Sequence, residues 1–278
     1  MKKRILSLFL VAALTMSFVG CKNEPPSKTT TPLETEAAIN KEANEITQNA
    51  FSNCMKKTTV RGNVGVYCKI KTGKKKNKKD VSLVQTQAFS FAVTPQKGLY
   101  YKKGTDMVKY KGENEGSDYE EYVIQSGEKE IIHYKILNDW GKDITEADTM
   151  DKISAFVNLD YSKISIQKME ENEKEYTMTG EIPNDFALEL ARAYGFQKET
   201  LELIRSVGSG VSLTMTIDKS SNLPTTIKLD TESFFDGKQD LLKEYFNLKL
   251  LHGFSYSISI TNLKYSKKAM TIPKKFTR

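Results

Sequence analysis

The sequence predicts an α+β fold in which one long, curved antiparallel sheet carries several helices on its concave face. Beyond the first 20 residues, apolar and polar residues alternate far more often than they follow helical spacing. Each predicted strand has one apolar face and one face of Ser, Thr, Lys or Gln, which is typical of an antiparallel sheet wetted on one side. Segments with helical spacing are available to cover the apolar side.

Four helices are expected. The first runs from about Leu33 to Met55, and its apolar stripe is Ile39, Ala43, Ile46, Ala50 and Cys54. A second, shorter helix begins near Thr145, a residue type that caps helix N-termini. Pro183 opens a third helix that Gly195 closes, and a fourth spans residues 197–207.

The strands follow one another through turns. The first has Val60, Gly62, Val64, Val66, Cys68 and Ile70 on one face, and the second has Val81, Leu83, Phe89, Phe91 and Val93. Gly73 and a lysine run form the turn between them. Further strands are expected at residues 99–101, 107–110, 119–125, 130–137, 163–168, 175–182, 211–217, 223–230 and 254–261.

The N-terminus has the order of an export signal. Lys2, Lys3 and Arg4 precede an apolar run that is too short to cross a bilayer, and small residues follow it. The segment 17–21, Ser-Phe-Val-Gly-Cys, resembles the lipobox of bacterial lipoproteins, which implies that residues 1–20 are removed and that Cys21 is lipidated. The alternative is an ordinary secretory signal in which Cys21 is incidental.

The rest of the chain divides into a tether and one domain. Residues 21–32 are rich in Pro and Thr and contain little to bury, so we expect a flexible tether behind the lipid anchor. Residues 33–278 are long enough for a single domain with a substantial core. The predicted protein is therefore extracytoplasmic and held to the bacterial cell membrane through Cys21.

The most specific sequence pattern is C-terminal: it consists of the strand 211–218 ending in Asp218, the returning strand with Leu223-Pro224, and a last strand followed by Thr271-Ile272-Pro273. With this pattern, about residues 34–276 resemble the lipoprotein-carrier superfamily of LolA-like and LppX/LprG-like proteins. The resemblance implies a half-open barrel whose better-known members hold acyl chains between sheet and helices. The alternative function is a structural or protein-interaction lipoprotein with a solid core.

The segment 234–251 is too long and too apolar for a simple loop. Leu242 and Phe246 make a second helical stripe beside that of Leu241, Tyr245 and Leu248, so this segment either plugs the barrel mouth or forms a lid over a ligand cavity. The sheet residues expected to line that cavity are Phe91, Met215, Tyr256 and Ile258, and a mostly apolar lining suits acyl chains.

Basic residues are concentrated in one place. The formal net charge is +7, which falls to +4 without Lys2, Lys3 and Arg4. The predicted hairpin turn holds Lys74, Lys75, Lys76, Lys78 and Lys79, which either form a solvated tip or contact anionic lipid or wall polymer. No aromatic residue interleaves these lysines, so nucleic acid is not an expected partner.

Cys54 and Cys68 are both expected to point into the layer between helix and sheet. An oxidising compartment would favour a disulfide between them, and the alternative is two buried free thiols.

The sequence does not predict an enzyme. His133 and His252 are the only histidines, and neither is accompanied by a nucleophile to activate. No phosphate-binding loop, HExxH helix or CxxC pair occurs, so no cofactor or metal is expected. The acidic residues around Asn172 are interpreted as a solvated hairpin tip rather than a calcium site.

Overall fold

The structure is a computed structural model that describes residues 32–73, 81–136, 138–146, 164–183, 211–230, 240, 243–244 and 251–276. The predicted signal peptide, Cys21 and the tether up to residue 31 lie outside these residues. So do the lysine run, the third and fourth predicted helices, and Leu242 and Phe246.

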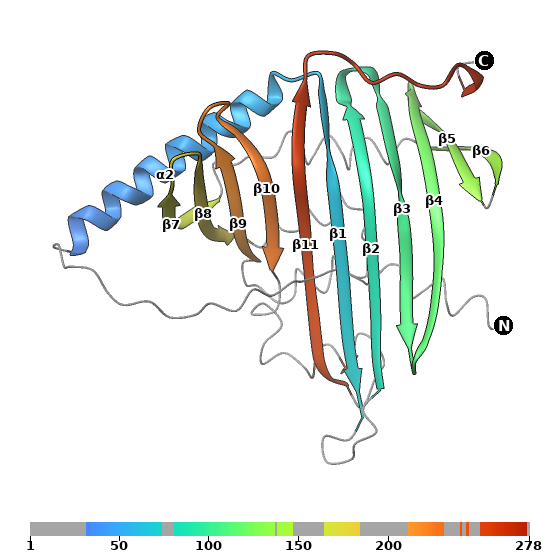
Figure 1. The fold of residues 1–278 in the computed structure, drawn as a ribbon, viewed down its shortest axis with the longest axis horizontal. Helices are drawn as coiled ribbons and strands as arrows, with labels where there is room; N and C mark the ends of the chain where they lie inside the picture. Colours follow the sequence, from blue (N-terminus) through green and yellow to red (C-terminus); the bar gives the residue numbers. More distant parts are fainter. Residues whose placement is uncertain are drawn as a thin grey trace.

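A single antiparallel sheet of eleven strands dominates the fold (Figure 1). Its spatial order is β6-β5-β4-β3-β2-β1-β11-β10-β9-β8-β7. The strands are β1 Thr59–Thr72, β2 Val81–Thr94, β3 Leu99–Tyr110, β4 Glu113–Ser126, β5 Lys129–Ile136, β6 Asp139–Glu146, β7 Ser165–Glu171, β8 Glu175–Ile182, β9 Val211–Asp218, β10 Leu223–Asp230 and β11 Leu251–Ser266. The predicted antiparallel sheet is confirmed.

Two meanders build this sheet. The first runs outward from β1 to β6, and the second runs inward from β7 to β11. They join where β11 pairs with β1, in the middle of the sheet. The sheet is not closed, because β6 and β7 stand at its opposite edges.

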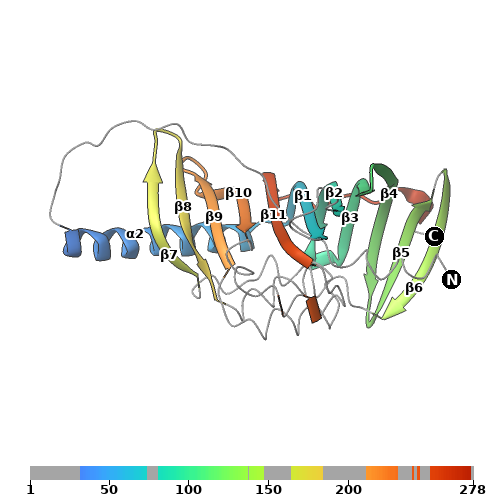
Figure 2. The ribbon, with the colours of Figure 1, turned by 90° about the horizontal axis from the view of Figure 1, so that it is seen from below.

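The helix α2 spans Pro32–Met55 and matches the first predicted helix. It packs against β7 and β10, across the half of the sheet that holds the second meander (Figures 1 and 2). Ala43, Ala50 and Cys54 of the predicted stripe are buried there, together with Phe51. In the described part of the chain α2 is the one complete α-helix, so the expected cover of several helices is confirmed for α2 alone.

The prediction that a helix begins near Thr145 is wrong. Thr145 belongs to β6, where it pairs with Glu130 of β5, and the ladder continues to Glu146 opposite Lys129. Thr is β-branched and suits a strand as well as an N-cap, so pairing with β5 decides its conformation. The strands expected at residues 99–101 and 107–110 are one continuous strand, β3.

The predicted first hairpin is confirmed, since β1 and β2 pair along their length up to Thr72 opposite Val81.

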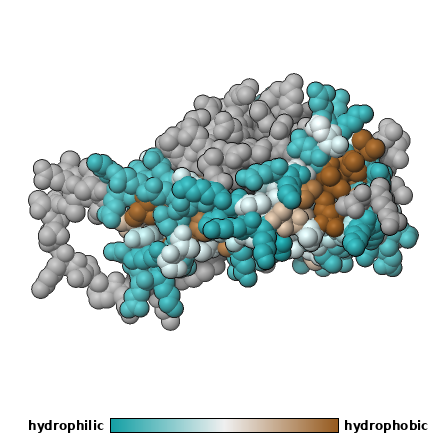
Figure 3. All heavy atoms as spheres, turned by 90° about the horizontal axis from the view of Figure 1, so that it is seen from above, coloured by the Kyte–Doolittle hydropathy of each residue, from teal (hydrophilic) through white to brown (hydrophobic). Residues whose placement is uncertain are grey.

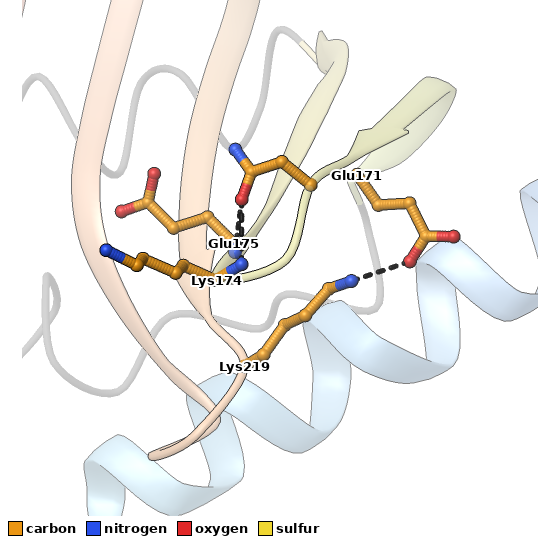
Figure 4. Close-up of polar contacts among 5 residues, drawn as sticks. Glu171, Lys174, Glu175 and Lys219 are labelled. Atoms are coloured by element: carbon orange, nitrogen blue, oxygen red, sulfur yellow. Dashed lines mark hydrogen bonds and ion pairs between the residues drawn. The ribbon is translucent and has the colours of Figure 1, made fainter.

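The β7–β8 turn is the solvated tip that the acidic residues predict. There the Asn172 side-chain oxygen accepts hydrogen bonds from the backbone N–H groups of Lys174 (2.8 Å) and Glu175 (2.9 Å) (Figure 4). Lys219 Nζ, from the neighbouring β9–β10 turn, lies 2.7 Å from Glu171 Oε2. These contacts tie the two turns together.

The chain after β11 forms a strap across the ends of the first meander. The Thr59 hydroxyl donates a hydrogen bond to the carbonyl of Lys268 (2.7 Å), and the N–H of Met270 donates to the Thr94 hydroxyl (3.1 Å). The strap ends in the short 3-10 helix η3, Lys274–Phe276, whose Phe276 is buried against Tyr122 and Trp140. Apolar side chains gather at this end of the molecule (Figure 3).

Candidate functional site

One face of the sheet, called the inner face here, carries the predicted apolar stripe of β1. All its members are buried: Val60, Gly62, Val64, Val66, Cys68 and Ile70. The alternation of β1 therefore predicts its orientation correctly. α2 packs on this same face, because its buried residues belong to one apolar cluster with the β1 stripe.

Strand pairing arranges the inner face in rows that run across the strands. One row passes from β9 to β1 through Leu213, Leu229, Ile258 and Val66, all of which are buried. The same row continues on β2, β3 and β4 through Gln87, Asp106 and Ser117. The adjacent row begins with Met215, Ile227, Ile260 and Val64 and ends with Phe89, Gly104 and Tyr119. The inner face is therefore apolar from β9 to β1, while its part on β2, β3 and β4, called the polar half here, mixes polar side chains with Phe89 and Tyr119.

Three of the predicted ligand-binding residues have described side chains: Met215 and Ile258 lie in these two rows, and Phe91 lies outside them, opposite Gly62. Met215 and Ile258 lie in adjacent rows of the apolar half and are 0% and 3% exposed. Phe91 lies over Gly62 of β1, since a β-carbon added to that glycine would come within 3.0 Å of the Phe91 ring. Tyr256 pairs with Cys68 through its backbone, and its side chain lies outside the description, as do Leu242 and Phe246.

The polar half of the inner face centres on Asp106 of β3. Asp106 is 8% exposed, and its carboxylate accepts a hydrogen bond from the side-chain amide of Gln85, with 3.2 Å between Gln85 Nε2 and Asp106 Oδ1. Lys102 Nζ is 2.9 Å from Glu121 Oε2 and 5.3 Å from the centroid of the Tyr119 ring. Burial raises the pKa of Tyr119, and the charges of Asp106 and Glu121 raise it further.

Sequence reasoning missed this polar half. The second strand was predicted from Leu83, Phe89 and Phe91, while Gln85 and Gln87 stand between them on the same face. Two amides inside an otherwise apolar stripe are the signal that would have located it, because a buried amide needs a polar partner.

The predicted disulfide is absent: Cys54 and Cys68 are both buried, and no disulfide joins them. Chain geometry explains this. Cys54 is five residues before Thr59, a reach of at most about 18 Å. Cys68 is nine residues along β1 from Thr59, about 30 Å away at 3.3 Å per residue. The two α-carbons are therefore much farther apart than the roughly 7 Å limit for a disulfide.

His133 has a structural environment. It is buried on β5, and its ring stacks on Phe276 with centroids 4.5 Å apart.

No group of His, Cys, Asp and Glu side chains that would hold a metal ion occurs among the described residues. None of the helical segments in the described ranges has the length and apolar character that a membrane span requires.

Comparisons with known proteins do not assign this chain to a family. No family model matches the chain, and no curated protein matches it. One solved structure, a DUF1329 family protein from Desulfovibrio piger, is similar over 82% of this chain and 93% of that chain, with 11% sequence identity and a TM-score of 0.25. A TM-score this low carries no argument, so the functional proposal rests on the residues of this chain.

Proposed function

We propose that the protein is a membrane-anchored extracytoplasmic lipoprotein that binds a hydrophobic or amphiphilic ligand against the inner face of its sheet. The observation that carries the proposal is the width of the apolar half. α2 packs against β7 and β10, whereas the apolar rows continue across β11 and β1. Among the described residues the apolar face therefore extends beyond α2, and an extended apolar face supports a role in holding apolar ligand surface.

The membrane anchor of this proposal is Cys21. Its support is the order of basic, apolar and small residues before that cysteine. In a bacterial host grown with a clickable palmitate analogue, we expect the wild-type chain to be labelled and the Cys21→Ser variant to be unlabelled. The Cys54→Ser variant is the matched control and should remain labelled. An unlabelled wild type would contradict lipidation.

A second candidate function is a structural or protein-interaction lipoprotein with a solid core. The complete burial of Met215 and the near-complete burial of Ile258 by the protein's own chain favour it. In that case the segment 234–251 is a plug rather than a lid.

One pair of substitutions separates the two functions. The chain without residues 1–20 and with Cys21→Ser is tested for binding of a fluorescent fatty-acid analogue, before and after the double change Leu242→Ser and Phe246→Ser. A lid predicts lost binding with a nearly unchanged melting temperature, and a plug predicts a loss of several kcal/mol of stability.

The control variant is Lys243→Ser, which changes a polar helical residue of the same segment. It should alter neither binding nor melting temperature. If the wild-type domain binds no acyl probe, the ligand-binding proposal is wrong.

A further inference from the structure

We infer that the outer face of the sheet, opposite the inner face, docks on an anionic phospholipid bilayer, the membrane to which Cys21 would anchor the chain. This inference rests on the proposed membrane anchor and adds the side of the domain that lies against the membrane. It starts from the polar side of the five central strands β10, β11, β1, β2 and β3, which are neighbours in the sheet (Figure 1).

The charged side chains of this outer face are almost all basic. Strand pairing places Arg61 of β1 opposite Lys264 of β11, and on β1 the basic residues alternate with the buried stripe of the inner face. Along the described lengths of the five strands, the outer face has one acidic residue, Asp230, and seven basic residues, which we call the basic face. The basic face consists of Arg61, Lys69, Lys71, Lys103, Lys109, Lys228 and Lys264.

The basic face is open to solvent. Six of its seven residues are exposed, and Lys69 is partly buried. Lys103 Nζ lies 3.4 Å from Glu120 Oε2 of β4, and among the described residues Lys103 is the one member of the basic face in an ion pair. The remaining cations repel one another across the face, so a partner that carries many negative charges would be attracted to it.

The dimensions of the basic face fit a planar partner. Arg61 and Lys71 are ten residues apart on β1, about 33 Å at roughly 3.3 Å per residue. From β10 to β3 the face crosses four strand spacings, about 19 Å at roughly 4.8 Å each. Cations spread over this distance cannot converge on one small anion, whereas an anionic bilayer can contact them together.

Met107 distinguishes a bilayer from a hydrophilic polymer. It is 46% exposed and lies on β3 between Lys103 and Lys109, on the same face because residues two apart in a strand share a side. A membrane interface accommodates an apolar side chain surrounded by cations, which is how amphipathic surfaces bind anionic lipid. A cell-wall polyanion offers no apolar surface to Met107, so the composition of this face favours the bilayer.

Vesicle co-sedimentation tests the inference on the chain without residues 1–20 and with Cys21→Ser, so that no lipid anchor contributes. The anionic vesicles contain phosphatidylglycerol and phosphatidylcholine in equal amounts, and the neutral vesicles contain phosphatidylcholine alone. We expect at least about tenfold tighter binding to the anionic vesicles, because each basic residue close to such a surface contributes about fivefold in affinity. Most of this binding should be lost between 0.1 M and 1 M salt, where the Debye length falls from about 10 Å to about 3 Å.

Two triple variants separate the basic face from net charge. Arg61→Gln, Lys109→Gln and Lys228→Gln together should lower the affinity for anionic vesicles at least about tenfold. The matched control removes the same charge from three exposed positions outside the basic face and should bind as the wild type does. Its changes are Lys41→Gln, Lys56→Gln and Lys174→Gln.

Met107→Ser separates the bilayer from a wall polymer. It should weaken binding to the anionic vesicles and leave binding to soluble poly(glycerol phosphate) unchanged. Melting temperatures close to that of the wild type confirm that the variants are folded, and the salt dependence of the wild type tests the inference without any substitution.

Equal affinity for the two kinds of vesicle would overturn the inference, as would equal losses in the two triple variants. Binding that survives in the triple variant of the basic face but is lost when the lysines of residues 74–79 become Gln would overturn it too. Tighter binding to poly(glycerol phosphate) than to anionic vesicles would assign the face to a wall polymer instead.

These outcomes are independent of the proposed function. Palmitate labelling of Cys21 and binding of the fluorescent fatty-acid analogue are measured separately, so both can succeed when the docking face fails. An unlabelled wild type whose Cys21→Ser chain still prefers anionic vesicles would contradict the anchor and leave the docking face standing.

Discussion

The ring of His133 stacks on the ring of Phe276, with centroids 4.5 Å apart and an interplanar angle of 25°. This contact joins the third-last residue of the chain to β5, near one edge of the sheet. Trp140 of β6 lies against the same phenylalanine, with ring centroids 4.6 Å apart. The C-terminal strap is therefore anchored in an aromatic cluster.

Replacing Phe276 with Ala should destabilise the protein by about 3 kcal/mol, because a buried aromatic side chain is removed. Urea unfolding measures the loss. Trp140 is the only tryptophan, so its fluorescence reports the cluster directly and should shift to longer wavelength in the folded variant. Phe276→Leu is the control, since it keeps an apolar side chain and should cost less. Unchanged emission and stability in Phe276→Ala would show that the strap is not anchored there.

The side chains of Cys54 and Cys68 should be protected from alkylation in the folded protein. Burial raises the pKa of Cys54 to about 11, so little thiolate exists at pH 8 to react. In the Cys21→Ser chain, iodoacetamide without reductant should add nothing to the native protein and two adducts after denaturation. Intact mass distinguishes this from a disulfide, which would leave the denatured chain unmodified.

How far the sequence predicts this fold depends on what fixes each element. The alternation in β1 and β9 predicts strand and orientation, because half-buried strands leave a period of two in the sequence. β6 was not predicted, since Asp139–Glu146 is largely exposed and has no clear alternation. Its conformation is determined by pairing with β5, a non-local interaction.

The residues of the site likewise divide into those that local periodicity predicts and those that depend on non-local contacts. Phe91, Met215 and Ile258 were predicted because apolar periodicity places them on the inner face. Asp106 was not, since its partner Gln85 is 21 residues away on another strand and the pair forms through register. The separation of Cys54 and Cys68 could have been predicted from strand length alone, because Cys68 lies nine positions along β1 from Thr59.

Two glycines should respond very differently to the same substitution. A β-carbon at Gly180 of β8 would lie 2.2 Å from the backbone oxygen of Ser165 on β7, and that backbone cannot rotate away. Gly180→Ala should therefore cost at least about 2 kcal/mol. At Gly65 the nearest atom is the Ser259 hydroxyl at 2.8 Å, which can rotate, so Gly65→Ala should change stability by less than about 1 kcal/mol.

Urea unfolding of both variants provides the comparison. Equal losses in the two would mean that β7 does not approach β8 as closely as the pairing of Ile166 with Gly180 requires.

The free energy of unfolding should decrease as the pH falls, because His133 becomes protonated. Burial lowers its pKa below the usual 6.5, and the nearby charge of Lys142 lowers it further. The unfolded chain therefore binds a proton at a higher pH than the folded chain does. By linkage, this contribution to stability is complete above pH 6.5 and is lost as the pH falls below that value. Protonation would also place a charge beside Phe276, whose neighbour Lys275 is already cationic and lies over the Trp140 ring.

The test compares urea unfolding at pH 7.5 and pH 5 in the wild type and in His133→Phe. The variant keeps an aromatic ring against Phe276 and removes the titrating group, so its stability should fall less over this interval. The carboxylates titrate in both proteins and cancel in the comparison. His252→Gln is the control for the other histidine and should retain the wild-type slope. An identical pH dependence in the wild type and His133→Phe would show that protonation of His133 is not coupled to folding, and the burial of its ring beneath Phe276 would then need another explanation.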